Sequence, residues 1–521
     1  MLAAVTVVLY LPGLTAPFIY DDLAHLIGRG EIQRLWPIGP LLDDGRPAGF
    51  LSFALNHAVT GMRPAGFRAV NIVIHLATGL LLMGLVSRVL RLPGIPAHVA
   101  RYADPLAFAA ALVFVVHPLN TGAVTYVIQR FESLSACFFV LALYALLRSA
   151  EHSRPRWYAA AIAAAWLAML TKQTSAVLPI TALLFDRAFL ANGWRDVFAR
   201  RWWVHLGFCA GIGVLMLSDA LRKSGVDAGS AGFGFGITPW EYLRSQPRSL
   251  ARYLQLTLWP ERLIFDYGWK VVDDPKLIYG LGALIVVLLV AAIVAWFVRP
   301  QLGFLGLATF AALAPSSSFL PIADLAVEYR MYLPLLSLLT LLVLLAWEGI
   351  CRATSDEDFR RKFGFALLAL TVAPLAVRTL LRNRDYQSPL LIWKQSADFN
   401  PDNGRANYNT AGRLGPGRLQ EGEPYFEAAI ASDFWDQAAV HTTWADYLVK
   451  NDQPEDAAIH YRQAIKLLPQ DVPVRIKLAE LYLAQGEREK ARAEAAAALK
   501  YDRRNKPAAA ILERLAGDPP P

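Results

Sequence analysis

Two adjacent carboxylates end the first apolar run of the sequence. The stretch "FIYDD" places Asp21 and Asp22 directly after the apolar segment that begins at Met1. One interpretation is a solvated stop after a helix. The other is a general base at a membrane surface, since a positioned carboxylate can remove a proton from a hydroxyl group. The two interpretations predict different surroundings for the pair.

Further charged residues lie within or beside apolar segments. A charge carried to the centre of a bilayer costs about 2.5–3.5 kcal/mol, so their recurrence predicts a polar cavity at one membrane face. Acids beside fixed cations suit a reaction in which a hydroxyl loses its proton while a phosphate departs. The set comprises the cations Arg46, Arg130, Lys172 and Arg330 and the carboxylates Glu132, Glu328 and Asp266.

Each of these charges also has a structural interpretation. Arg130 with Glu132, and Glu328 with Arg330, are spaced as local ion pairs. Lys172 has a side chain long enough to reach lipid headgroups from a buried backbone position. These alternatives stay open at the level of sequence.

Composition identifies the kind of protein that must position these residues. The chain has 521 residues, of which 55% are hydrophobic and 18% charged, with a mean hydropathy of +0.34. Such apolarity excludes an ordinary soluble enzyme and favours an integral membrane protein. From Asn383 onward the sequence holds 18 Lys or Arg and 20 Asp or Glu residues and no long apolar run. We therefore predict a membrane domain at 1–382, a connector at 383–402, a soluble domain at 403–505 and a C-terminal tail at 506–521.

Eleven apolar segments are candidate transmembrane helices. Several are shorter than the ~20 residues that a simple span needs. The prediction is an all-α fold with a polytopic membrane domain of about 11 spans. The segments are 1–16, 67–90, 104–118, 124–147, 157–170, 173–190, 202–219, 277–298, 302–319, 331–350 and 363–381.

The charges between these segments predict their orientation. With Met1 in the cytoplasm, the short cytoplasmic loops hold fifteen Lys or Arg residues, whereas the short loops on the other side hold Lys172 and Arg330. Basic loops stay in the cytoplasm. Eleven crossings then place Asp21, Asp22 and the C-terminal domain outside.

The soluble part repeats itself with a period of 34 residues. "TTWADYLVKNDQPEDAAIHYRQAIKLLP" aligns with "IKLAELYLAQGEREKARAEAAAALKYDR", and small residues such as Ala445 and Ala479 coincide. This period is typical of tetratricopeptide repeats, which stack paired helices into a short α-solenoid with a concave surface. We predict two clear repeats and a degenerate one at about 403–436, with a spacer as the alternative.

The order of the motifs carries a resemblance to a known family. "FIYDD", "GRPAGFLSFALNH", "FRAVNIVIHLATGLLL", "HPLNTGAVTYVIQRFESLSA", "LTKQTSAVLPI", "LTLWPERLIFDYGW" and "EYRMYLPLLSL" precede the repeats. This series resembles the transmembrane-and-tetratricopeptide (TMTC-like) O-mannosyltransferases and their bacterial relatives, of the C-type (GT-C) glycosyltransferase superfamily. The resemblance extends from about residue 5 to about residue 505. The sequence has "TKQT" where the animal members usually show Lys-Glu.

The resemblance implies an inverting transfer of a sugar from a polyprenyl-phosphate carrier to a hydroxyl of an exported protein. It implies that the acidic pair, Asp21 and Asp22, carries the catalytic base. Arg130, Lys172 and Arg330 are then candidates for binding the donor phosphate, supported by the remaining charges: Arg46, Glu132, Glu328 and Asp266. Cations can neutralise a single phosphate, so we expect no metal and no cofactor.

The expected setting is a bacterial inner membrane, with a cytoplasmic N-terminus and periplasmic repeats that bind the acceptor protein. Membrane lipid is an expected partner and nucleic acid is not. Two other functions stay open: a glycosyltransferase for lipid or cell-wall glycan, and a non-catalytic scaffold for an export or pilus machine.

Overall fold

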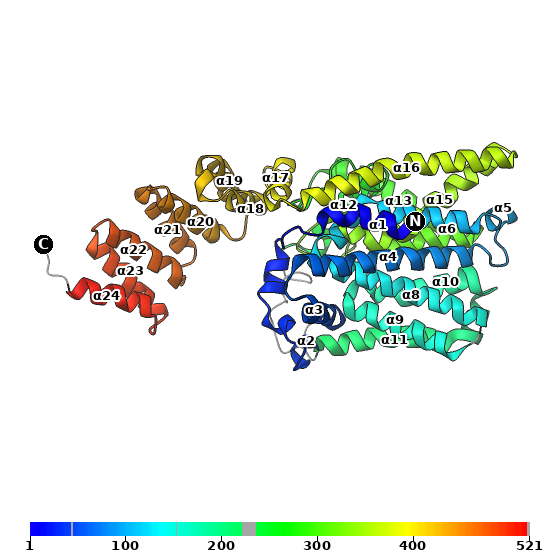
Figure 1. The fold of residues 1–521 in the computed structure, drawn as a ribbon, viewed down its shortest axis with the longest axis horizontal. Helices are drawn as coiled ribbons and strands as arrows, with labels where there is room; N and C mark the ends of the chain where they lie inside the picture. The colour runs from blue at the N-terminus through cyan, green and yellow to red at the C-terminus, as the bar shows by residue number, and fades with distance from the viewer. Residues whose placement is uncertain (43–44, 153, 221–235, 518–521) are drawn as a thin grey trace. The chain divides into compact units, whose positions relative to one another are not determined.

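The computed structural model describes residues 1–42, 45–152, 154–220 and 236–517. These residues form helices and no β-strand, which confirms the predicted all-α class (Figure 1). They divide into two compact units. The first combines Met1–Leu263 with Lys270–Ser388, and the second combines Ile264–Trp269 with Pro389–Pro521.

The first unit is a bundle of apolar helices, several of which begin at proline. Proline suits the first helical turn, where its missing N–H has no intrahelical partner. Among the described residues of the unit, six helices begin with proline: α3, α4, α9, α12, α13 and α14. The main helices are α1 (Leu2–Tyr10), α3 (Pro47–Thr60), α4 (Pro64–Val89), α6 (Ala103–Val116), α8 (Arg130–His152), α9 (Pro155–Thr171), α10 (Leu178–Phe185), α11 (Trp194–Ala220), α12 (Pro239–Leu258), α13 (Pro275–Val298), α14 (Pro300–Leu313), α15 (Tyr332–Ala353) and α16 (Glu357–Asp385).

The structure does not confirm eleven membrane spans. Within the described residues, six helices are long and apolar enough to cross a membrane, or up to seven if the bent pair Ala103–Val116 and Pro118–Val124 is one span. The segments predicted at 157–170 and 173–190 fall in α9 and α10, of 17 and 8 residues. At 1.5 Å per residue even α9 extends only about 26 Å. The chain is nonetheless an integral membrane protein.

Helix α8 lies at the centre of this bundle. Of its apolar stretch 61% is buried inside the protein, whereas none of the corresponding stretch of α13 is buried. It packs against α4 and α9, and Figure 1 shows these helices side by side. Charged side chains at the start of α8 are therefore held by neighbours on several sides.

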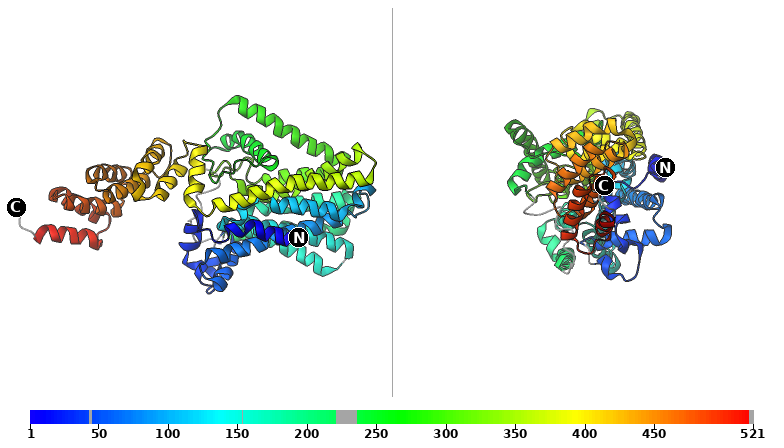
Figure 2. Two further views of the ribbon diagram at one scale, coloured as in Figure 1. Left: turned by 45° about the horizontal axis from the view of Figure 1, so that its top comes forward. Right: turned by 90° about the vertical axis from the view of Figure 1, so that its left-hand side faces the viewer.

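The second unit is a stack of paired helices (Figure 2). The pairs are α18 (Gly404–Leu414) with α19 (Leu419–Ala431), α20 (Gln437–Lys450) with α21 (Pro454–Leu467), and α22 (Val472–Ala484) with α23 (Arg488–Tyr501). The small residues that recur every 34 positions are buried where the helices cross: Ala411, Ala445, Ala479, Ala457, Ala491, Ala464 and Ala498. This is the predicted tetratricopeptide solenoid.

Both ends of the second unit differ from the expected linker and tail. The region predicted as a connector holds α17 (Pro389–Phe399), whose Ile392 and Trp393 are buried. The region predicted as a tail holds α24 (Lys506–Gly517). Its Ile511 and Leu515 are buried, because two apolar residues four positions apart share one helix face.

Candidate active site

The turn that carries the acidic pair is strained and treats its two carboxylates differently. Tyr20 has φ of 44°, a left-handed conformation that is uncommon for a bulky residue. Asp22 is fully buried, with Oδ2 accepting from the Ile19 N–H at 3.1 Å and Oδ1 from the Ile128 N–H at 2.8 Å. Asp21 is partly exposed. Asp22 therefore ties the turn to the segment before α8, and Asp21 is the carboxylate that solvent can reach.

Burial dominates the electrostatics of Asp22. It raises the pKa of this carboxyl to about 7, against the opposing effects of the two backbone hydrogen bonds and of Arg68. The charge on Asp21 raises the pKa further. A group held in this way titrates near neutral pH, although both of its oxygens already serve the turn.

Arg68 fixes the chain that leads into the acidic turn. Its buried guanidinium donates to the carbonyl oxygens of Ala16, of Pro17 at 2.7 Å and of Thr125 at 2.8 Å. Arg68 is not among the site residues predicted from the sequence. The available signal was a cation in the first turns of the otherwise apolar helix α4.

Tyr126 connects Asp21 to the same segment. The Asp21 N–H donates to the Tyr126 hydroxyl at 3.2 Å, and Tyr126 is buried. Burial raises the pKa of this phenol well above its usual value, and the charges of Asp21 and Asp22 raise it further. The phenol therefore stays neutral and can act as a hydrogen-bond donor beside the carboxylate.

Lys172 and Glu132 form an ion pair near the same turn. The Lys172 ammonium also lies over the Tyr329 ring, 5.5 Å from its centroid. Tyr329 in turn interacts electrostatically with Asp21 and with Glu132. Burial lowers the pKa of Lys172 to about 8, partly offset by Glu132, and the charges of Arg46 and Arg330 lower it further. Lys172 is therefore a cation below about pH 8, with two more cations nearby.

Arg46 comes from the loop before α3. Its Nε donates to the Gln173 side-chain oxygen at 3.4 Å, and its guanidinium lies 4.9 Å from the centroid of the Phe131 ring. Gln173 donates to the Gly45 carbonyl oxygen at 2.7 Å. The "TKQT" motif thus positions both its own lysine and Arg46.

Arg330 and Glu328 lie in the short 3-10 helix Glu328–Met331 that precedes α15, and both are buried. The Arg330 guanidinium donates to the carbonyl oxygens of Asp324 at 2.8 Å and Ser316 at 3.4 Å. Arg330 thus fixes the loop that precedes this helix. Its charge is also a minor contribution to the lowered pKa of Lys172, which is caused mainly by burial.

Arg130 occupies a closed environment. Its guanidinium is fully buried and donates to Asn71 Oδ1 at 2.6 Å, Asn56 Oδ1 at 2.6 Å, the Phe67 oxygen at 2.8 Å and the Ser52 oxygen at 3.2 Å. These bonds join α3, α4 and α8. The geometry favours a positioning role for Arg130 over direct contact with a phosphate.

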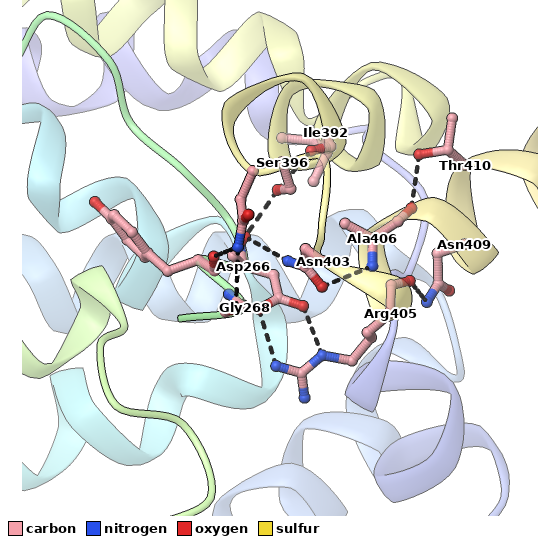
Figure 3. Close-up of polar contacts among 11 residues, drawn as sticks. Asp266, Gly268, Ile392, Ser396, Asn403, Arg405, Ala406, Asn409 and Thr410 are labelled. Atoms are coloured by element: carbon pink, nitrogen blue, oxygen red, sulfur yellow. Dashed lines mark hydrogen bonds and ion pairs between the residues drawn. The ribbon is translucent and has the colours of Figure 1, made fainter. Parts of the chain in front are cut away.

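Asp266 belongs to the second unit, where it forms a local clamp (Figure 3). Its carboxylate receives Arg405 Nε at 2.5 Å and Nη2 at 2.9 Å. Its backbone N–H donates to Ser396 at 3.2 Å, and its carbonyl accepts from Asn403 at 3.1 Å. Asp266 thus belongs to a different compact unit from the other predicted site charges.

The first unit thus brings Asp21, Glu132, Lys172 and Arg330 near Tyr329, with Arg46 near Lys172. Asp21 can accept a proton, and the three cations can stabilise an anion that forms beside it. Among the described residues no group of three or more His, Cys, Asp or Glu side chains is arranged to hold a metal ion.

Two family models match this chain. Residues 47–219 match dolichyl-phosphate-mannose-protein mannosyltransferase, and residues 448–515 match the tetratricopeptide repeat. The first match contains Lys172 and the helices α3, α4, α8 and α9.

Several proteins named protein O-mannosyl-transferase are similar to the chain. Tmtc1 of Drosophila melanogaster is 32% identical over 197 residues, which cover 35% of this chain and 21% of the relative. TMTC3 of Mus musculus is 22% identical over 534 residues, which cover 91% of this chain and 55% of the relative. Tmtc3 of Drosophila melanogaster is 25% identical over 495 residues, which cover 82% of this chain and 52% of the relative.

The chain spans about half the length, or less, of these curated relatives. The similarity to TMTC3 nevertheless includes both the membrane bundle and the repeats. The predicted resemblance is confirmed: the chain is similar to TMTC-like protein O-mannosyl-transferases along most of its length.

Proposed function

We propose that this protein is a membrane glycosyltransferase that moves a sugar from a polyprenyl-phosphate carrier to a hydroxyl group of an exported protein. The observation that carries the proposal is the partly exposed Asp21 beside a set of three cations, Lys172, Arg46 and Arg330. The protein O-mannosyl-transferase names of the relatives support the same class of reaction.

The proposed reaction is a single displacement with inversion. Asp21 removes the proton from the acceptor hydroxyl, and that oxygen forms a bond to the anomeric carbon of the sugar. The bond between this carbon and the phosphate oxygen breaks at the same time, and polyprenyl phosphate leaves. Lys172, Arg46 and Arg330 stabilise the charge that develops on the leaving phosphate.

The other predicted site residues have supporting roles in this proposal. Asp22 holds the turn, and Arg130 holds α8 against α3 and α4. Glu132 positions Lys172 through their ion pair. Glu328 supports the start of α15, and Asp266 organises the second unit. Asp21 is thus preferred to Asp22 as the base, because both Asp22 oxygens accept backbone hydrogen bonds.

We further propose that the tetratricopeptide repeats bind the acceptor polypeptide. Paired-helix stacks of this kind present a concave surface to a partner. Ending the chain after Gln470 removes α22, α23 and α24. Transfer to a full-length acceptor should fall more than transfer to a short peptide at high concentration, because the repeats raise the effective concentration of the acceptor. Equal losses with both acceptors, or none, would exclude this role.

The proposed setting is a bacterial inner membrane with Asp21 and the repeats on the periplasmic side. The excess of Lys and Arg in alternate loops supports this orientation. A reactive cysteine introduced at exposed Glu31, beside the acidic turn, should be modified by a membrane-impermeant reagent in intact spheroplasts. Modification only after lysis would reverse the orientation.

The test of the activity uses the purified full chain with radiolabelled polyprenyl-phosphate sugars. Exported proteins, lipids and cell-wall glycan are offered as acceptors, and Asp21→Asn is the negative control. Label in protein supports the proposal. Label in lipid or glycan favours the alternative acceptor class, and no label with any donor favours a scaffold.

A further inference from the structure

A second feature of the first unit is an apolar cavity of about 430 Å³ between α4, α8, α14 and α15. Leu85, Phe139, Phe304 and Leu336 are among its lining residues. This volume is within the range of small-molecule sites.

The charged end of the cavity lies far from the acidic turn. Arg68, near the start of α4, holds the chain before Asp21, whereas Val89 at the other end of α4 lines the cavity. The 21 residues from Arg68 to Val89 correspond to about 32 Å of helix. From that end the cavity extends along α15 as far as Leu333, at the start of this helix.

The hydroxyl groups of the lining donate to backbone carbonyls. That of Thr181 donates to Val177 at 3.0 Å, that of Ser337 to Pro334 at 3.1 Å and that of Thr340 to Leu336 at 2.6 Å. Water in a cavity needs two to four polar partners. With these donors satisfied by their own helices, the cavity favours hydrocarbon.

The length of the cavity fits a lipid chain. Its lining on α15 extends from Leu333 to Glu348, about 22 Å along the helix. Half of a ~30 Å hydrocarbon core is about 15 Å. A single acyl chain that enters from the Glu348 end can therefore lie along the cavity within its own leaflet.

The mouth of the cavity is basic. In the described part of the chain, Arg299 and Glu348 are its charged lining residues. The Glu348 carboxylate forms ion pairs with Arg299 at 3.2 Å, Arg352 at 2.9 Å and His98 at 2.7 Å. Its side chain is 17% exposed, against 49% for Arg299 and 66% for Arg352. The cations thus face outward and the carboxylate is covered.

We propose that this cavity binds one acyl chain of an anionic glycerophospholipid, with its phosphate held by Arg299 and Arg352. Basic pockets between transmembrane helices recognise anionic headgroups in this manner. The headgroup cations Arg299 and Arg352 are different residues from the cations assigned to the donor phosphate, and the inference does not depend on the proposed function.

The test is native mass spectrometry of the purified full chain, titrated with phosphatidylglycerol and with phosphatidylcholine of identical acyl chains. We expect one tightly retained phosphatidylglycerol and weaker binding of phosphatidylcholine. Ala308→Trp fills the cavity and should weaken binding about tenfold or more, since each buried methylene contributes about a factor of four. Ala291→Trp, on the exposed face of α13, is the matched control and should bind normally.

Arg299→Gln should remove the preference for phosphatidylglycerol, whereas Arg361→Gln, an exposed arginine outside the cavity lining, should keep it. Equal binding of the two lipids by the unmodified protein would overturn the proposal. So would displacement of phosphatidylglycerol by polyprenyl phosphate, or unchanged binding in Ala308→Trp. If Ala308→Trp does not fold, the comparison of the two lipids in Arg299→Gln and Arg361→Gln decides alone.

Discussion

Two charged clusters of the membrane unit are built in opposite ways. In one, Asp186 is fully buried, and its oxygens receive Arg201 Nε at 2.8 Å, Arg201 Nη2 at 2.6 Å and His205 Nε2 at 2.9 Å. In the other, Asp21 is partly exposed and lies within electrostatic range of Tyr329 and its cations. The first cluster is closed by its own bonds, whereas the second contains a carboxylate, Asp21, that is partly exposed.

The difference separates structural charges from candidate catalytic ones. A buried ion pair whose partners satisfy each other holds helices together and offers nothing to a ligand. A carboxylate that solvent reaches, next to several cations, can accept a proton from a bound hydroxyl group. By this criterion Asp21 resembles a catalytic group, whereas Asp22 and Arg130 resemble the Asp186 cluster.

The largest expected effect is that of Asp21→Asn. This change removes the proposed base but keeps the shape of the side chain, so sugar transfer should fall about 10²–10⁴-fold. The unfolding temperature should stay unchanged. Glu31→Gln, an exposed acid in the same loop, is the matched control and should transfer normally. A loss below tenfold would remove Asp21 from the chemistry.

Asp186→Ala should have the opposite effects to Asp21→Asn, lowering stability while leaving transfer nearly unchanged. It leaves Arg201 buried without its partner, which typically costs about 3–5 kcal/mol of stability. Thermal unfolding in detergent should show a lower midpoint, while the transfer rate per folded molecule stays close to that of the unmodified protein. A stable variant with strongly reduced transfer would mean that this cluster also takes part in catalysis.

Asp22→Asn tests the pH dependence of stability. Burial holds the pKa of Asp22 near 7 in the folded protein, above its value in an unfolded chain. The folded state therefore binds more protons between about pH 4 and pH 7, and stability should fall as the pH rises through this window and level off above it. Unfolding curves of Asp22→Asn should show a smaller fall. Identical pH profiles would contradict the buried environment of Asp22.

Lys172→Gln should weaken inhibition by the product polyprenyl phosphate. A hydrogen bond to a charged group is worth about 1.5–3 kcal/mol, so the inhibition constant should rise about tenfold or more. In the unmodified protein inhibition should also weaken as the pH rises through about 8, the pKa of Lys172. Lys362→Gln, an exposed lysine, is the control. Unchanged inhibition in Lys172→Gln would make its pair with Glu132 purely structural.

The smallest expected effect is that of metal removal. Three cations are available to neutralise the leaving phosphate, so dialysis against a chelator should leave the transfer rate unchanged. Loss of transfer that added Mg²⁺ or Mn²⁺ restores would show that the carboxylates bind a metal.

Much of the fold could be predicted because its signals are local. Apolar runs predicted helices, and the 34-residue period predicted the solenoid with its buried Ala445 and Ala479. The number of spans was not confirmed because segment length and apolarity do not show where a helix breaks. The helix α24 was missed because its apolar pair, Ile511 and Leu515, is short and lies in a polar region.

The site was predicted less completely, because its details depend on contacts between distant segments. Asp21 and Asp22 are adjacent in sequence, and Asp22 is distinguished by its burial and by its bonds to the Ile19 N–H and to the Ile128 N–H, 106 positions away. Tyr126 and Tyr329 are ordinary aromatic residues until the fold places them beside Asp21. In the sequence, Arg130 and Lys172 look equivalent as cations in apolar segments. They differ because Arg130 forms tertiary hydrogen bonds to α3 and α4, which the sequence does not reveal.

The most direct test of the central claim is the anomeric configuration of the product. Proton NMR of the sugar on the acceptor, compared with that of the polyprenyl-phosphate donor, reports whether the anomeric carbon was attacked once or twice. With Asp21 as a base and no covalent sugar intermediate, the configuration should be inverted, and the product should be absent with Asp21→Asn. A retained configuration, or full product formation by Asp21→Asn, would contradict the mechanism.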